Sequence, residues 1–191
     1  MTYFGTELTP RLVEVYRQMD SAYAEASRES GFSCAGCDGV KCCTVDLIVH
    51  TFAEMLFLRR GFRTLESSLQ KHIKDRSREI LKARATDPLG MEYRESVCAL
   101  NLDGLCILYE YRPMICRLAG IPHIIRRPDS SFKQSGGCTR FEDQIKPVFP
   151  NIVIDRTSFY QQMAQLEIYA VQEIGNRTVR RTISEILSDC I

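Results

Sequence analysis

The sequence has almost no excess charge, no long apolar run and only 3 histidines, and each shortage excludes a class of protein. Lys and Arg number 25 against 24 Asp and Glu, and the net charge of +1 gives no global field that would favour DNA, RNA or anionic lipid. No stretch approaches the roughly 18 apolar residues that would span a bilayer, and the first residues lack the apolar core of a secretory signal. We therefore predict a cytoplasmic protein that binds neither nucleic acid nor membranes.

Several signatures of catalytic and metal sites are also missing. The chain has no ferredoxin run C-x2-C-x2-C-x3-C-P, no deaminase H-x-E with P-C-x2-C, and no H-E-x2-H. It shows no acid–base pair, phosphate loop or cofactor fingerprint, so it indicates no substrate and leaves open whether the protein is an enzyme. His50, His72 and His123 have no paired metal spacing, and only His123 is a candidate spare ligand, for which packing is the simpler interpretation.

Cysteine, by contrast, is abundant, with 9 residues. A chain of 191 residues with 45% hydrophobic residues does not need disulfides to fold. In a reducing compartment, clustered cysteines favour metal ligands or redox-active thiols, and sulfur-rich ligand sets select zinc or iron–sulfur clusters. Eight cysteines form the candidate ligand set: Cys34-x2-Cys37-x4-Cys42-Cys43, then Cys98, Cys106, Cys116 and Cys138. Cys190 stands apart and is interpreted as a bystander.

The way in which the eight thiolates divide among sites stays open at this point. Adjacent side chains in an extended segment point to opposite faces, so Cys42 and Cys43 could serve two sites. Eight thiolates satisfy two four-sulfur sites, or one four-sulfur cluster with a second zinc site or redox pair. A nucleophilic Cys–His dyad is a weaker hypothesis, because clustered thiols are poor evidence for one activated thiol.

Two arginines and a proline flank Cys116 and complete the candidate site. Pro113 suits the first turn of a short helix, which would place Cys116 near the start of that helix, where exposed N–H groups favour a thiolate. Arg112 and Arg117 would offset the negative charge that four thiolates leave on a metal ion or cluster. The alternative interpretation of both arginines is an ordinary place on the surface.

The cysteine pattern and a string in the second half of the chain resemble the YkgJ-type cysteine-cluster family. That string is Gly104-x-Cys106-x2-Tyr109-Glu110-x-Arg112-Pro113-x2-Cys116-Arg117. Proteins of this family are described as zinc- or iron-chelating, and some relatives attach the domain to protein-modifying systems such as flagellin lysine methylation. The resemblance covers about residues 32–140 and implies that all eight cysteines are metal ligands. It favours an iron–sulfur cluster, for electron transfer or as an auxiliary to a protein partner, with a zinc-binding structural or metal-delivery module as the alternative.

Apolar residues spaced at three and four positions predict a mainly α fold. We expect a single domain over residues 1–191, in which helices over about 10–30 and 157–189 pack around a loop-rich cysteine module over about 32–140. Two further helices are predicted between these, one starting at a Thr51/Glu54 capping box and ending at Gly61, the other starting at Thr64. The predicted apolar stripes are Leu12, Val15, Tyr16, Met19, Tyr23 and Ala26 in the first helix, and Phe159, Met163, Leu166, Ala170 and Ile174 in the last long one.

Overall fold

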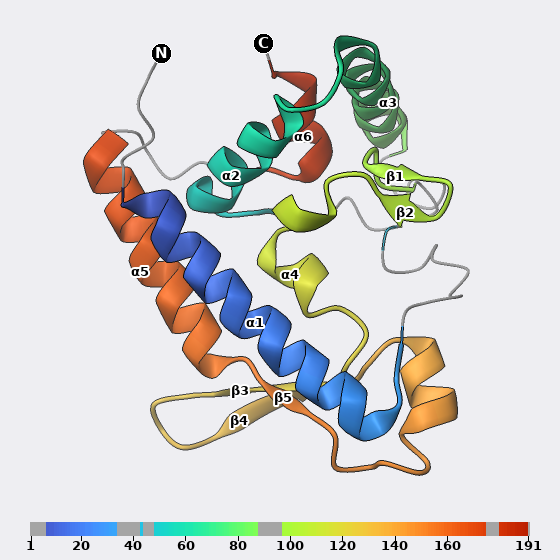
Figure 1. The fold of residues 1–191 in the computed structure, drawn as a ribbon, viewed down its shortest axis with the longest axis vertical. Coiled ribbons are helices and arrows are strands. Elements are labelled where there is room, and N and C mark those ends of the chain that lie inside the picture. Colours follow the sequence, from blue (N-terminus) through green and yellow to red (C-terminus); the bar gives the residue numbers. More distant parts are fainter. Residues whose placement is uncertain (1–6, 34–42, 44–47, 88–96, 175–179, 191) are drawn as a thin grey trace. The chain divides into compact units, whose positions relative to one another are not determined.

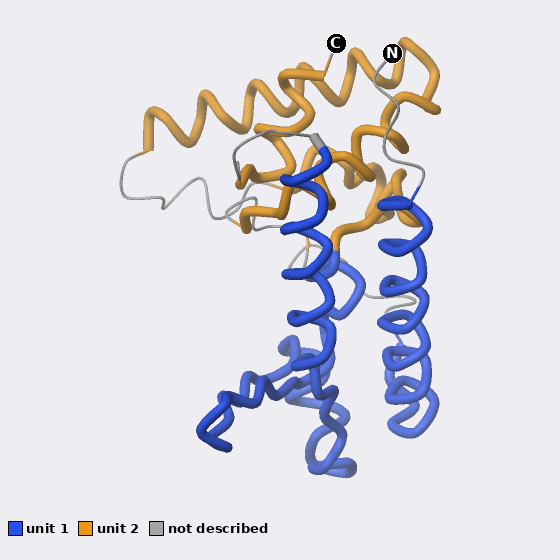
Figure 2. The backbone as a smooth tube through the Cα atoms, turned by 90° about the vertical axis from the view of Figure 1, so that its left-hand side faces the viewer, with its two compact units in different colours: residues 1–37, 114–175 blue, residues 38–113, 176–191 orange. Residues whose placement is uncertain are grey.

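A computed structural model describes residues 7–33, 43, 48–87, 97–174 and 180–190, which belong to two compact units. Unit 1 comprises Met1–Cys37 and Met114–Gly175, and unit 2 comprises Asp38–Pro113 and Asn176–Ile191 (Figure 2). Each unit therefore combines two segments that are distant in the sequence. The described elements are mainly helical, as predicted, while the single domain over 1–191 stays a prediction.

The two long helices of unit 1 pack against each other along their lengths (Figure 1). Helix α1 spans Leu8–Ser30 and helix α5 spans Thr157–Ile174. Gly31 ends α1 with a φ of 66°, a left-handed conformation that glycine adopts without strain. The predicted stripes are confirmed by the burial of their members: Leu12, Val15, Tyr16, Met19 and Ala26 in α1, and Phe159, Met163, Leu166 and Ala170 in α5. Tyr23 is only half-buried, and the side chain of Ile174 lies outside the described residues.

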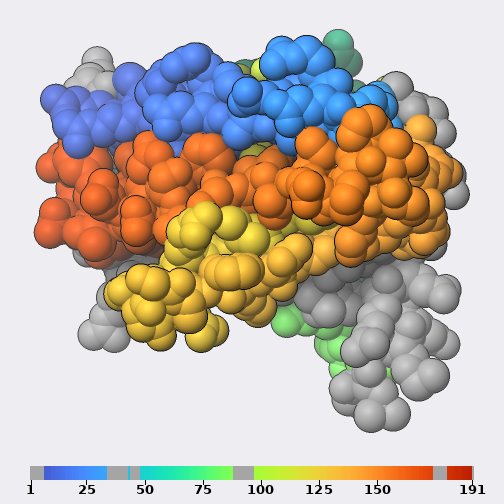
Figure 3. Space-filling view, turned by 90° about the horizontal axis from the view of Figure 1, so that it is seen from below, coloured from blue at the N-terminus to red at the C-terminus, as the bar shows by residue number. Residues whose placement is uncertain are grey.

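A small sheet completes unit 1. Strands β3 (His123–Arg126) and β4 (Phe132–Ser135) pair in antiparallel fashion, and β5 (Ile154–Asp155) adds to β3 in parallel. The exposed pair Arg126 Nε–Asp155 Oδ2 joins β3 to β5 at 2.8 Å. On the face shown in Figure 3, the β3–β4 hairpin lies beside α5, and α1 lies on the other side of α5.

Unit 2 is built on three helices: α2 (Phe52–Phe62), α3 (Ser67–Thr86) and α6 (Ile183–Ser188). The predicted capping box at the start of α2 is confirmed, since Glu54 N donates to Thr51 Oγ1 and Thr51 N donates to Glu54 Oε2. Helix α6 packs on α3 and α2, whereas α5 belongs to unit 1. The helical range expected over 157–189 is therefore divided between the two units, as α5 and α6.

None of the helices in the described ranges is long and apolar enough to cross a membrane. The irregular middle of the chain contains short elements, as expected: the hairpin β1 (Asn101–Leu102) and β2 (Leu105–Cys106), the 3-10 turn η3 (Tyr109–Tyr111), the single helical turn α4 (Met114–Arg117) and the π-helical turn η4 (Phe141–Ile145). These short elements carry the described candidate ligands other than Cys43, or lie next to them.

Candidate metal centre

A tight hairpin brings the chain near Cys98 back towards Cys106 in unit 2. Asp103 and Gly104 form its two-residue turn with φ values of 51° and 84°, and Asp-Gly is a favoured pair for a turn that needs two positive φ angles. Asn101 pairs with Cys106, and Asn101 N donates to Cys98 O at 2.9 Å. The Asp-Gly pair is therefore the local signal that folds this part of the cysteine pattern.

Cys43 joins the same neighbourhood from a distant part of the chain. The amide of Cys98 donates a hydrogen bond to the carbonyl of Cys43 at 2.6 Å. Burial raises the pKa of the Cys106 thiol, and the charge of Cys43 raises it further, while the amide of Leu108 and the charge of Arg112 lower it. The structure thus brings Cys43, Cys98 and Cys106 into one region of unit 2.

Close packing fixes the segment that follows Cys106. The Tyr111 ring lies against Gly61 of α2, so closely that a Cβ built on Gly61 would overlap the ring at Tyr111 Cγ. The ring also packs on Phe57, with centroids 5.0 Å apart. Gly61 was predicted to end its helix, but α2 continues to Phe62, so the absence of a side chain at Gly61 serves the approach of Tyr111.

Arg112 lies where its charge reaches the Cys106 thiol. Its guanidinium stacks over the Tyr109 ring at 3.3 Å from the centroid, and its Nε donates to Tyr109 O at 2.8 Å. Its charge also lowers the pKa of Cys106, which is the direction expected for an arginine that stabilises a thiolate. Pro113 is buried and directly precedes α4.

Cys116 and Arg117 belong to α4 in unit 1, and this helix is a single turn of 4 residues. So short a helix has little dipole, which weakens the predicted stabilisation of a Cys116 thiolate by the helix start. Arg117 is not a surface residue: its side chain is 4% exposed, donates to Asp20 Oδ2 at 2.5 Å and stacks over the Tyr16 ring at 4.1 Å. Both of these contacts are with α1, so Arg117 holds α4 on α1, and its role towards a metal stays a prediction.

Arg117→Ala should lower the free energy of unfolding by about 1–3 kcal/mol, because it removes a partly buried charge-assisted hydrogen bond and a cation–π contact. The matched control is Arg17→Ala, which breaks an exposed pair with Glu14 within α1, the helix that Arg117 contacts, and should leave stability close to that of the wild type. Denaturant unfolding followed by circular dichroism measures both variants. Equal stabilities would contradict the assigned role of Arg117.

Cys138 is held by a turn of unit 1 through main-chain contacts. Its amide donates to Gly120 O at 2.9 Å, and its carbonyl accepts from Glu142 N at 2.9 Å. Gly120 has a φ of 98° and lies against the Phe32 ring, which itself packs edge-on against Phe141. The residues just before the Cys34 segment therefore pack beside the turn that holds Cys138.

The structure tests the predicted ligand set only in part. Cys34, Cys37 and Cys42 lie outside the described residues. The division of the chain assigns Cys43, Cys98 and Cys106 to unit 2, and Cys116 and Cys138 to unit 1. Within the described ranges, no group of three His, Cys, Asp or Glu side chains is placed to hold one metal ion.

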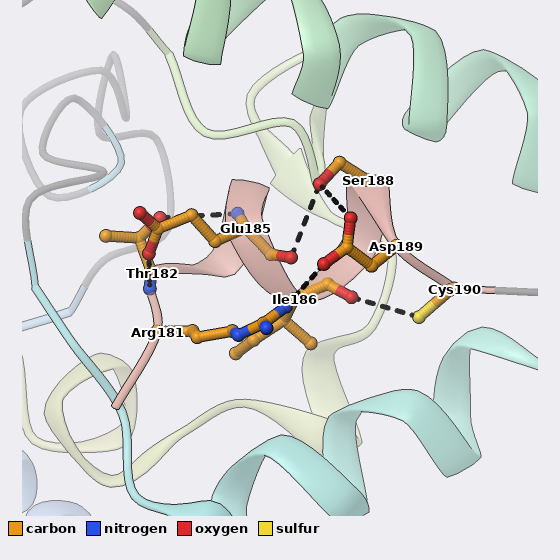
Figure 4. A network of polar contacts seen from close by, with 7 residues as sticks. All are labelled: Arg181, Thr182, Glu185, Ile186, Ser188, Asp189 and Cys190. Carbon is orange, nitrogen blue, oxygen red and sulfur yellow. Dashed lines mark hydrogen bonds and ion pairs between the residues drawn. The ribbon is translucent and has the colours of Figure 1, made fainter. Parts of the chain in front are cut away.

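His123 and Cys190, which lie outside the predicted ligand set, both have pKa values that their surroundings shift. His123 lies in β3, where burial and the charges of Arg156 and Lys133 lower its pKa, which favours the neutral ring. Cys190 is 8% exposed, and its Sγ lies 3.1 Å from Ile186 O, to which it donates (Figure 4). Burial raises the pKa of Cys190, as expected for a thiol that serves packing.

Sequence reasoning missed three residues that shape the region around these cysteines. Asp20 engages the charge of Arg117, Gly137 permits close approach of the chain beside Cys138, and Arg156 is buried beside the turn after α4. The Gly136-Gly137 pair next to Cys138 is the sequence signal that could have identified Gly137. Nothing local distinguishes Asp20 or Arg156 from other charged residues, because their partners are distant in the sequence.

A scan against protein-family models finds no match to the chain, and searches of curated proteins and of solved structures find no similar protein. The resemblance to YkgJ-type proteins therefore stays a prediction that rests on the quoted motif.

Proposed function

We propose that the protein binds metal through its clustered cysteines, as an iron–sulfur cluster that serves electron transfer or supports a protein-modifying partner. The observation that carries the proposal is the gathering of Cys43, Cys98 and Cys106 in unit 2, although Cys43 is far from the other two in the sequence. Cysteines that come from distant segments and share one region are typical of the ligand sets of zinc and iron–sulfur clusters.

The surroundings of these thiols fit a group of that kind. Arg112 supplies positive charge where metal-bound thiolates would leave a negative excess, and the amide of Leu108 donates to Cys106. Arg112 is fixed in turn by the Tyr109 ring and carbonyl. A bound cluster would supply one-electron redox chemistry, while these residues orient the thiolates and stabilise their charge.

The proposal extends to Cys34, Cys37, Cys42, Cys116 and Cys138, which complete the pattern of eight. The spacing and the family resemblance support this extension. The described members of the set already fall into two groups, because Cys116 and Cys138 belong to unit 1, whereas Cys43, Cys98 and Cys106 belong to unit 2. The proposed arrangement is thus two four-sulfur sites, the first of the two divisions that eight thiolates allow.

Anaerobic purification followed by iron, zinc and sulfide analysis and visible absorption tests the proposal. We expect a brown protein that contains iron and acid-labile sulfide, and whose visible absorption is reversibly bleached by a reductant. A colourless protein loaded with zinc would replace the iron–sulfur assignment by the structural zinc module, and chelation should then unfold it. A protein free of both metals would refute metal binding altogether.

A further inference from the structure

One exposed side of helix α5 carries no charged residue. Residues three and four positions apart share one side of a helix. On this side, which we call the outward face of α5, the exposed residues are Gln161, Ala164, Gln165, Ile168 and Gln172. Ile168, in the middle of the face, is 59% exposed. Figure 3 shows α5 exposed between α1 and the β3–β4 hairpin. The chain therefore presents a large apolar side chain to solvent, surrounded by uncharged amides.

Other long helices of this protein present charges to solvent. Helix α3 exposes Lys71, Arg78, Glu79 and Lys82. Charged side chains are the usual covering of a surface helix. A surface that lacks charge and has an apolar residue at its centre is instead typical of the surfaces that proteins bury against one another. The outward face of α5 thus has the composition of an interface.

A groove of about 480 Å³ lies between α5 and α1, beside the outward face. Gln165 belongs to both the groove and the face, and the buried apolar side chains of Val15 and Leu166 also line the groove. The charged residues at the groove are Arg11 and Glu14 of α1, which form ion pairs with neighbours on their own helix. A second helix laid on the face could therefore insert its side chains into this groove, as packed helices do.

The outward face is complementary to itself. A glutamine amide is both a donor and an acceptor, so glutamines can pair with glutamines. Gln165 lies three residues before Ile168 and Gln172 four residues after it, so two α5 helices that run antiparallel about Ile168 bring each Gln165 opposite the other Gln172. Within the described chain, neither glutamine makes a side-chain hydrogen bond.

The chain already uses an amide pair of this kind between packed helices. Gln162 of α5 donates to Gln18 of α1 at 3.3 Å. A charged partner surface would fit less well, because its charges would lose water against a face that offers no opposite charge. The same uncharged face on another molecule of this protein has no such cost, and isologous pairs of this type form the commonest class of oligomer.

We propose that the outward face of α5 docks a second copy of this chain, with the two α5 helices antiparallel about Ile168 and with Gln165 of each copy opposite Gln172 of the other. The arrangement makes the protein a symmetric dimer. It does not depend on the metal-binding function, because every residue that carries it belongs to α5 or to the neighbouring groove.

Analytical ultracentrifugation of the full-length protein, with a reductant that prevents intermolecular disulfides, tests the proposal. We expect the wild type to dimerise with a dissociation constant in the micromolar range or tighter, over roughly 1–100 μM protein. Ile168→Glu should weaken the dimer by about 100-fold or more, because it buries an unpaired charge at the centre of the interface. The matched control is Val13→Glu, at an exposed valine of α1 that does not line the groove, and it should change dimer affinity by less than about twofold.

Two double variants test the antiparallel register. Gln165→Lys with Gln172→Glu places opposite charges against each other in the proposed dimer, whereas Gln165→Lys with Gln172→Lys places like charges there. The first variant should therefore dimerise at least about tenfold more tightly than the second. Both positions are exposed, so these variants also decide the question if Ile168→Glu fails to fold by circular dichroism.

Three results would overturn the proposal. A wild type that stays monomeric throughout the concentration range would exclude a second copy as the occupant and would leave the face to a different protein. A dimer that Ile168→Glu leaves intact, or that Val13→Glu weakens equally, would use another surface. Equal affinities of the two double variants would contradict the antiparallel pairing of Gln165 with Gln172.

Discussion

Cys106→Ser is expected to reduce the metal content of the purified protein to about half or less, whereas Cys190→Ser should leave it unchanged. The charges of Cys43 and Arg112 both act on the Cys106 thiol, in the region of unit 2 that also contains Cys98. A hydroxyl does not replace a thiolate as a ligand for zinc or iron, so the loss of one ligand removes metal from that site. Metal analysis of the two variants purified in parallel measures the difference.

Cys190→Ser is a suitable control because the cysteine is buried and its side chain makes a hydrogen bond that serine can also make. The thiol donates to Ile186 O, one turn earlier in the chain. The substitution therefore keeps both the size and the polar contact of the residue. If Cys190→Ser loses metal and Cys106→Ser retains it, the ligand assignment is wrong and the C-terminal segment supplies a ligand.

Gly137→Ala is expected to lower the free energy of unfolding by about 1–3 kcal/mol, the usual cost of overpacking, and also to reduce metal content. A Cβ at Gly137 would lie 2.5 Å from Gly120 O and 3.0 Å from Pro122 Cδ. Backbone atoms cannot yield as a flexible side chain does, so the turn must move. That movement strains the hydrogen bond from Cys138 N to Gly120 O and displaces a candidate ligand.

Gly136→Ala provides the control for this prediction, because it adds the same methyl group one residue earlier. The new Cβ would meet Glu142 Oε1 at 2.8 Å, which is the end of a side chain that can rotate away. Thermal or denaturant unfolding and metal analysis should place Gly136→Ala near the wild type. Equal effects of the two substitutions on stability and metal content would contradict the proposed role of the close contact.

The features that could be predicted from the sequence depend on short-range patterns. The stripe of α1 and the Thr51/Glu54 capping box involve residues within one helix or one turn, and both are confirmed. The family motif from Gly104 to Arg117 is also a local pattern. It nevertheless spans the boundary between the two units, because Pro113 ends a segment of unit 2 and Met114 begins one of unit 1.

The features that could not be predicted depend on contacts between distant residues. Arg117 meets Asp20, 97 positions earlier, and Arg156 meets Leu118, 38 positions earlier. No periodicity or spacing encodes such pairs, so the sequence could not separate an arginine that docks a helix from one that faces thiolates. The motif correctly indicated arginines beside Cys116. Only the tertiary structure shows that the charge of Arg117 is paired with Asp20.

Mass spectrometry of the anaerobically purified protein, under native and then denaturing conditions, tests the central claim most directly. If clustered cysteines hold a metal group, the native mass should exceed the mass of the polypeptide by that of iron and sulfide, and denaturation should release the excess. Alkylation after denaturation should then modify all 9 cysteines, because denaturation releases metal-bound thiolates as free thiols. A native mass equal to that of the bare chain, or cysteines that remain paired after denaturation, would contradict the claim.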